Sequence, residues 1–157
     1  MSLIRRFSFV LVLYVAFVFV QSLFFKFTNS PETVYIFGTL NGWAGGLGFP
    51  GLFAPSGIFS QYVIGTAELI ASLVILASLL PALRWLRPFG ALIGLAVISG
   101  AILFHLFTPL GVSVLNTDGT YDHGELFGLA CGVWVSCALL LLVDRDRLLA
   151  LLPARKA

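Results

Sequence analysis

Charged side chains are scarce in this sequence, and their scarcity restricts the class of protein. Only 10% of the 157 residues are Asp, Glu, Lys or Arg, whereas soluble domains carry roughly 25%. The hydrophobic share is 59% and the mean hydropathy is +1.03. This composition excludes an ordinary soluble domain and predicts an integral membrane protein whose main partner is the lipid bilayer. The net charge of +2 is too small to suggest nucleic-acid binding.

Cysteine is also nearly absent, which excludes two kinds of site. The sequence has two cysteines, Cys131 and Cys137, within its last apolar run. On a helix they lie about 120° apart and about 9 Å along the axis, too far to form a disulfide with each other. They form neither a C-x-x-C redox pair nor a zinc-binding pattern. We expect both to be small, buried residues.

Long apolar runs are what the sequence does have. About 20 helical residues cover the roughly 30 Å of a bilayer's hydrocarbon core. We predict an all-α fold, a polytopic bundle of four transmembrane helices that makes one membrane domain of residues 1–157. The helices are expected at about residues 3–25, 61–80, 89–107 and 123–143.

Two outer loops, at residues 27–60 and 108–122, connect these helices. Within the first, Asn29-Ser30-Pro31-Glu32 is a helix-start signal and predicts a short interfacial helix over Pro31–Leu40. Residues 41–60 are rich in glycine and proline. A lipid-exposed loop would leave backbone polar groups unsatisfied, so we expect this segment to cover the bundle at the water interface.

The basic residues give the orientation. Only Lys26 falls on the outer side of the four-pass arrangement, and this asymmetry predicts that both termini are cytoplasmic. The residues on the inner side are Arg5, Arg6, Arg84, Arg87, Arg145, Arg147, Arg155 and Lys156.

The last apolar run carries a small residue at every fourth position. Gly124, Gly128, Gly132 and Ser136 form a small-xxx-small pattern, which favours close approach of another helix. Glu125 falls within the same strip of the helix. We therefore expect Glu125 to face protein rather than lipid.

Polar side chains converge on the outer third of the predicted bundle. Glu68 lies about 10 Å below the start of its helix. An ionised carboxylate there costs on the order of 2.5–3.5 kcal/mol unless it is paired, protonated or hydrated. The candidate functional site consists of Gln21, Lys26, Glu68, His105, His123 and Glu125.

The residues leave three interpretations of this site open. In the first, Glu68 beside Lys26 or His105 relays protons or holds a quinone carbonyl. In the second, the site binds a metal ion, although the sequence has no local ligand spacing such as H-x-x-x-H. Its N/O ligands would be His105, His123, Glu68 and Glu125. In the third, the pairs Lys26–Glu68 and His105–Glu125 only fix the register of the helices.

Four short blocks resemble the DoxX-like family of bacterial membrane proteins. The first and most specific is Gln21-Ser22-Leu23-Phe24-Phe25-Lys26-Phe27-Thr28, followed by Pro31-Glu32-Thr33-Val34-Tyr35-Ile36-Phe37. The others are Gly65-Thr66-Ala67-Glu68-Leu69-Ile70, Ser99-Gly100-Ala101-Ile102-Leu103-Phe104-His105-Leu106 and Gly124-Glu125-Leu126-Phe127-Gly128. They occur in the family's order, within roughly residues 10–143.

The resemblance implies a four-helix membrane protein, because that is the architecture of DoxX-like proteins. Their name comes from a subunit of a thiosulfate:quinone oxidoreductase, and other members are linked to thiol stress. Lys26, Glu68 and His105 carry over as polar signature positions, without catalytic roles. The sequence has no outward-facing cysteine pair, which disfavours thiol–disulfide exchange. The glycine-rich segment 42–57 is longer than the simplest family pattern and is a candidate lid or partner surface.

The resulting prediction is an accessory protein or subunit of a membrane redox system in a bacterial inner (plasma) membrane. A quinone or a small sulfur compound is expected at the outer polar site, with other redox subunits or further copies of the chain as partners. The alternatives are a small-molecule or proton-coupled transporter and a structural membrane scaffold. No helix is interrupted at its midplane, which disfavours transport. Whether the chain is an enzyme stays open.

Overall fold

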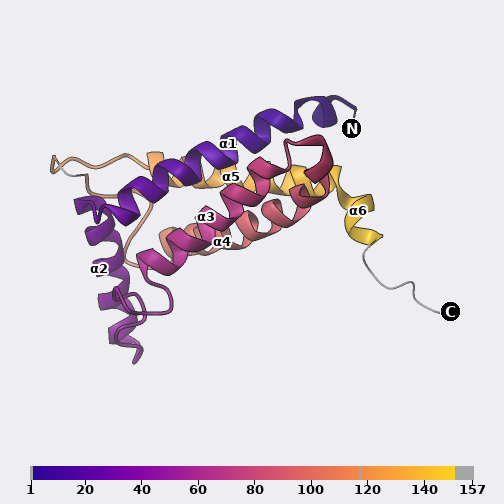
Figure 1. Cartoon of the computed structure of the whole chain (residues 1–157). Helices are drawn as coiled ribbons and strands as arrows, with labels where there is room; N and C mark the ends of the chain where they lie inside the picture. Colours follow the sequence, from indigo (N-terminus) through magenta and orange to yellow (C-terminus); the bar gives the residue numbers. More distant parts are fainter. Residues whose placement is uncertain (1, 117, 151–157) are drawn as a thin grey trace.

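The structure, a computed structural model, describes residues 2–116 and 118–150, with side chains from Phe7 onward. These residues form six α-helices and one 3-10 helix (Figure 1). The bounds are α1 Ser2–Phe27, α2 Pro31–Gly46, α3 Gln61–Ala77, η1 Pro81–Leu86, α4 Arg87–Phe107, α5 Glu125–Val143 and α6 Arg145–Leu149. The described residues contain no strand, only one isolated bridge between Leu115 and Tyr121. The predicted all-α class is confirmed.

Helices α1, α3, α4 and α5, called here the core helices, lie side by side. Each contacts two neighbours, in the order α1, α3, α4, α5 and back to α1. Apolar side chains from all four meet in one buried cluster, which includes Phe19, Ile75, Ile98 and Val133. Large apolar side chains also cover the outside, as Phe24 and Phe107 are more than 70% exposed. An apolar exterior around an apolar core is what a lipid solvent permits.

Three stretches are long and apolar enough to cross a membrane, namely Phe7–Phe27, Pro81–Phe107 and Glu125–Val143. Helix α3 is also apolar but has only 17 residues. At 1.5 Å per residue, it covers about 25 Å. These findings support the prediction of a membrane protein.

Helix α2 runs across the end of the core helices where α1 finishes (Figure 1). Its start is as predicted, since Ser30 caps the Thr33 N–H and Pro31 occupies the first turn. The predicted end at Leu40 is wrong, because the helix continues to Gly46. The apolar spacing of Phe37, Leu40 and Ala44 explains this difference. It places all three on one face, which is buried against Phe53, Leu110 and Val114.

Other helix ends differ from the prediction for local reasons. Helix α5 begins at Glu125 rather than 123, because His123 and Gly124 adopt left-handed backbone, with φ of 51° and 88°. Helix α3 ends at Ala77 rather than 80, where a turn leads into η1. Helix α4 begins two residues early, at Arg87, and α1 extends to Phe27.

The predicted small-residue face of α5 is only partly correct. A Cβ atom on Gly132 would lie 2.3 Å from the Tyr14 hydroxyl, whereas one on Gly128 would meet nothing within 4 Å. Glu125 is exposed and does not face a neighbouring helix. Positions four residues apart drift about 40° around a helix at each step, so a run of four cannot all face one partner. The buried stripe instead follows Ala130, Val133, Cys137 and Leu140.

Candidate functional site

Lys26 and Glu68 form an ion pair between α1 and α3. The Lys26 Nζ donates a hydrogen bond to Glu68 Oε1 at 3.1 Å and lies 3.1 Å from Oε2. It also donates to the Ser22 hydroxyl. The side chains of Lys26 and Glu68 are only 15% and 6% exposed. Pairing of this kind offsets much of the cost of holding a carboxylate inside an apolar helix.

The pair is positioned by the junction of α1 and α3. Gln61 donates from Nε2 to the Lys26 carbonyl at 3.0 Å and to Asn29 Oδ1 at 2.9 Å, which ties the end of α1 to the start of α3. The lysine stem then passes over Gly65, where an added Cβ would lie 3.5 Å from Lys26 Cδ. Glu68 follows Gly65 by three positions on the same face of α3.

One carboxylate oxygen of Glu68 is not hydrogen bonded. Oε2 is buried and, although it lies near Nζ, no described residue donates a hydrogen bond to it. The lysine charge 3.1 Å away still stabilises Oε2, so this oxygen is ion-paired although it accepts no hydrogen bond from the described residues. A ligand hydroxyl that donates to Oε2 would add a hydrogen bond to a charged acceptor.

His105 lies near the end of α4 but belongs to a different contact. Its Nδ1 is 2.7 Å from the Gly111 carbonyl oxygen, and its ring packs edge-on against Phe127 at a centroid distance of 5.7 Å. With the proton on Nδ1, the ring donates to the carbonyl and keeps Nε2 as an acceptor. Among the described residues, no hydrogen bond or ion pair joins His105 to Glu68 or Glu125. The histidine therefore anchors the segment after α4.

The remaining candidates do not gather around Glu68. Gln21, His123 and Glu125 are all exposed, although the sequence predicts that they share one polar site inside the bundle. No group of three or more His, Cys, Asp or Glu residues able to hold a metal occurs in the part of the chain that the structure describes. The described residues therefore give the metal interpretation no support, and the predicted pair of His105 with Glu125 is wrong, because His105 bonds to Gly111. The left-handed turn at His123 and Gly124 starts α5 with Glu125 exposed.

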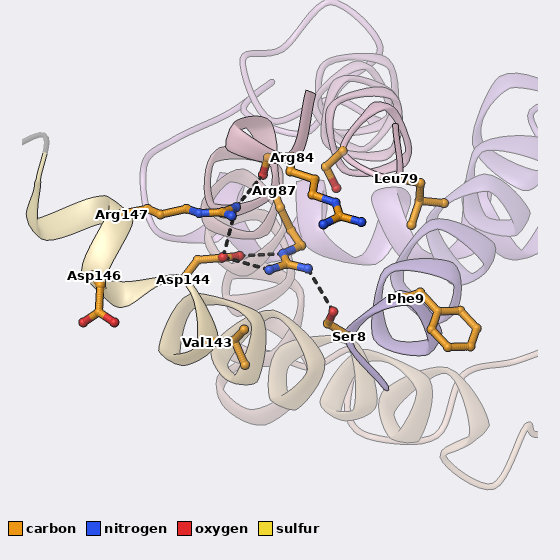
Figure 2. A pocket seen from close by; sticks show the side chains of 10 residues that line it. Ser8, Phe9, Leu79, Arg84, Arg87, Val143, Asp144, Asp146 and Arg147 are labelled. Carbon is orange, nitrogen blue, oxygen red and sulfur yellow. Dashed lines mark hydrogen bonds and ion pairs between the residues drawn. The ribbon is translucent and has the colours of Figure 1, made fainter. Parts of the chain in front are cut away.

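Sequence reasoning missed a second ion pair, at the other end of the core helices. Arg87 donates from Nε to Asp144 Oδ2 at 2.5 Å and from Nη2 to Oδ1 at 2.8 Å, and its Nη1 donates to Ser8 at 2.9 Å (Figure 2). Asp144 is buried. The sequence suggested only that Asp144 ends a helix and that Arg87 marks orientation. The sequence feature that could have predicted this pair is Asp144, an acidic residue directly after an apolar run, at the end of the molecule where the arginines lie.

A cavity of about 460 Å³ lies beside this second pair, and we call it the arginine cavity. It is bordered by α1, the turn after α3, η1, the start of α4, the end of α5 and α6. Its lining residues are Ser8, Phe9, Ser78, Leu79, Arg84, Arg87, Val143, Asp144, Asp146 and Arg147 (Figure 2).

Asp122 organises the segment that precedes α5. Its Oδ1 accepts hydrogen bonds from the N–H groups of Val114 at 2.7 Å and Gly124 at 3.0 Å, and Oδ2 accepts from Leu126 at 3.1 Å. Partial burial acts to raise the pKa of this carboxyl, but the backbone hydrogen bonds together outweigh it and lower the pKa from its usual 3.8. Asp122 thus caps α5 and fixes the segment between α4 and α5.

Comparison of the chain with protein-family models, with curated proteins and with solved structures gives no significant match.

Proposed function

We propose that this chain is a DoxX-like integral membrane protein that serves as an accessory or subunit of a membrane redox system. Its role is to hold a quinone at the Lys26–Glu68 pair, while partner subunits supply and remove electrons. The observation that carries the proposal is the buried Glu68 Oε2, which lacks a hydrogen-bond donor beside a partly accessible lysine.

The pair offers both kinds of hydrogen bond that a quinone uses. Lys26 has three N–H donors, and Ser22 and Glu68 Oε1 each accept one, which leaves one for a quinone carbonyl. Glu68 Oε2 accepts from the hydroxyl that replaces this carbonyl in the reduced form. A single site therefore suits the oxidised and the reduced ring.

The surroundings of the pair suit an apolar ring. Phe27 and Tyr62 pack beside each other at a centroid distance of 6.3 Å, and both are partly exposed next to Lys26 and Gly65. Aromatic side chains favour contact with a flat conjugated ligand. An anionic sulfur compound would meet the carboxylate of Glu68 at close range, which makes a neutral quinone the better ligand.

The proposal includes four membrane passes, by α1, α3, α4 and α5, in a bacterial inner membrane with cytoplasmic termini. Arg84, Arg87, Arg145 and Arg147 lie at one end of the core helices and Lys26 at the other, the asymmetry expected of a cytoplasmic and an outer side. The short α3 crosses by local thinning of the bilayer. The side chains of Arg5 and Arg6, and all of Arg155 and Lys156, lie outside the described residues.

The test is a titration of the purified protein in detergent with ubiquinone-1, followed by isothermal calorimetry. Glu68→Gln keeps the size of the side chain but replaces the charged acceptor, and we expect it to weaken binding by roughly tenfold or more. Glu125→Gln makes the same chemical change at an exposed position of α5 and should bind like the wild type. Absence of saturable binding to the wild type, or equal weakening in both variants, would leave the pair with a purely structural role.

A further inference from the structure

The arginine cavity lies at the opposite end of the molecule from the Lys26–Glu68 pair and takes no part in the proposed quinone site. Ser8 and Phe9 are near the start of α1, while Lys26 is near its end. Ser78 and Leu79 follow α3, while Glu68 lies in its first half. The chemistry of this cavity therefore needs its own explanation.

The cavity has an excess of positive charge. Asp144 is occupied by Arg87 and also lies 3.4 Å from Arg147 Nη1. Figure 2 shows the Asp146 carboxylate directed away from Arg84, Arg87 and Arg147, and the Arg84 guanidinium directed toward Leu79. Because the buried carboxylate is already neutralised, Arg84 leaves a positive charge at the mouth of the cavity.

Hydrogen bonds hold two of the three arginines that line the cavity. Arg87 is fixed by its two hydrogen bonds to Asp144 and one to Ser8, and Arg147 donates to the Arg84 carbonyl at 3.1 Å. This last bond holds the backbone of η1 against α6. The exposed Arg84 guanidinium forms no hydrogen bond with the described residues, so its N–H groups are available to an anion.

The other side of the cavity is apolar. Phe9, Leu79 and Val143 line it, and Phe9 and Leu79 are also exposed on the outer surface. A small hydrophilic anion would gain nothing from these side chains. An amphipathic ligand, with an anionic head and a hydrocarbon chain, would contact both halves.

We propose that the arginine cavity binds the phosphate group of an anionic phospholipid, with Arg84 as its principal ligand. The planar guanidinium suits two phosphate oxygens at once. The acyl chains run outward over Phe9 and Leu79 into the surrounding lipid. Basic cavities between helices at the membrane surface have the chemistry that recognises such headgroups.

The test is native mass spectrometry of the full-length protein with added dioleoylphosphatidylglycerol or dioleoylphosphatidylcholine. The expected result is a preference of at least roughly tenfold for phosphatidylglycerol, because both lipids carry the phosphate but the choline cation of phosphatidylcholine offsets its charge and is repelled by the arginines. Arg84→Gln should bring phosphatidylglycerol binding close to the level of phosphatidylcholine. Arg84→Lys, which keeps the charge but not the planar fork, should retain part of the preference.

Arg145→Gln is the matched control, since it removes the same charge at the same end from a side chain that does not line the cavity. It should leave the lipid preference within about twofold of wild type, because exposed charges are screened. Equal loss in Arg145→Gln and Arg84→Gln would overturn the assignment in favour of diffuse surface attraction. So would equal binding of the two lipids. Saturable binding of inorganic phosphate, without any preference between the two lipids, would show that the cavity binds free phosphate rather than a lipid headgroup, and would overturn the proposal.

Discussion

Arg87 and Asp144 are 57 positions apart in the chain, and they form a two-pronged ion pair that joins the start of α4 to the end of α5. The third hydrogen bond, to Ser8, brings in α1. A single guanidinium therefore connects three of the four core helices at one end. At the other end, Lys26 and Glu68 connect α1 to α3.

Removing one partner of the buried pair should destabilise the protein strongly. Asp144→Asn leaves Arg87 partly buried without its counter-charge, and we expect a loss of about 3–5 kcal/mol in the free energy of unfolding. Thermal unfolding in detergent measures the effect. The control is Asp146→Asn, which alters an exposed carboxylate two positions away and should change stability little. Similar melting temperatures for the two variants would contradict the role given to the pair.

Two glycines of α4 should respond in opposite ways to alanine. A Cβ on Gly90 would lie 2.8 Å from the Ile75 backbone nitrogen, whereas one on Gly100 would meet nothing within 4 Å. Gly90→Ala should push α3 and α4 apart and cost about 1–3 kcal/mol. Gly100→Ala should leave stability unchanged or slightly higher, since alanine is the better helix former. A well-folded Gly90→Ala protein with wild-type thermal stability would mean that α3 and α4 are not in such close contact.

How far the sequence predicts the structure depends on how local the signal is. The Ser30 cap and the depth of Glu68 are local, and they lead directly to the start of α2 and to a paired carboxylate. The rotation of α5 about its own axis cannot be predicted from nearby residues. Positions four residues apart differ by about 40° around the helix, and this difference decides whether Gly128 or Gly132 contacts Tyr14.

The partners of the polar side chains were the least predictable feature. His105 and Glu125 occur at the same predicted level, yet the histidine bonds to Gly111, which follows a turn that the sequence pattern does not specify. Asp144 pairs with Arg87 only because η1 returns the chain to the end of α5. Such contacts depend on tertiary geometry rather than on spacing.

Acid should weaken the segment between α4 and α5 that Asp122 holds. The pKa of this carboxyl is lowered in the folded protein, so its stabilising contribution is complete above the usual 3.8 and is lost as the pH falls through the lower folded value. The protection of the Val114, Gly124 and Leu126 amides, measured as exchange relative to the intrinsic rate at each pH, should therefore fall below about pH 4. Asp122→Asn should show low protection at every pH. Unchanged protection of these amides at low pH in the wild type would rule out Asp122 as the group that fixes the segment.

The central claim, that a quinone binds at the Lys26–Glu68 pair, is tested most directly by photolabelling with an azido-ubiquinone and mapping the labelled residues by mass spectrometry. The account predicts labels on the end of α1 and the start of α3, around Phe27 and Tyr62, that excess ubiquinone-1 abolishes and that Glu68→Gln reduces. Labels spread over the exposed faces of α4 and α5, unaffected by excess ubiquinone-1, would contradict it.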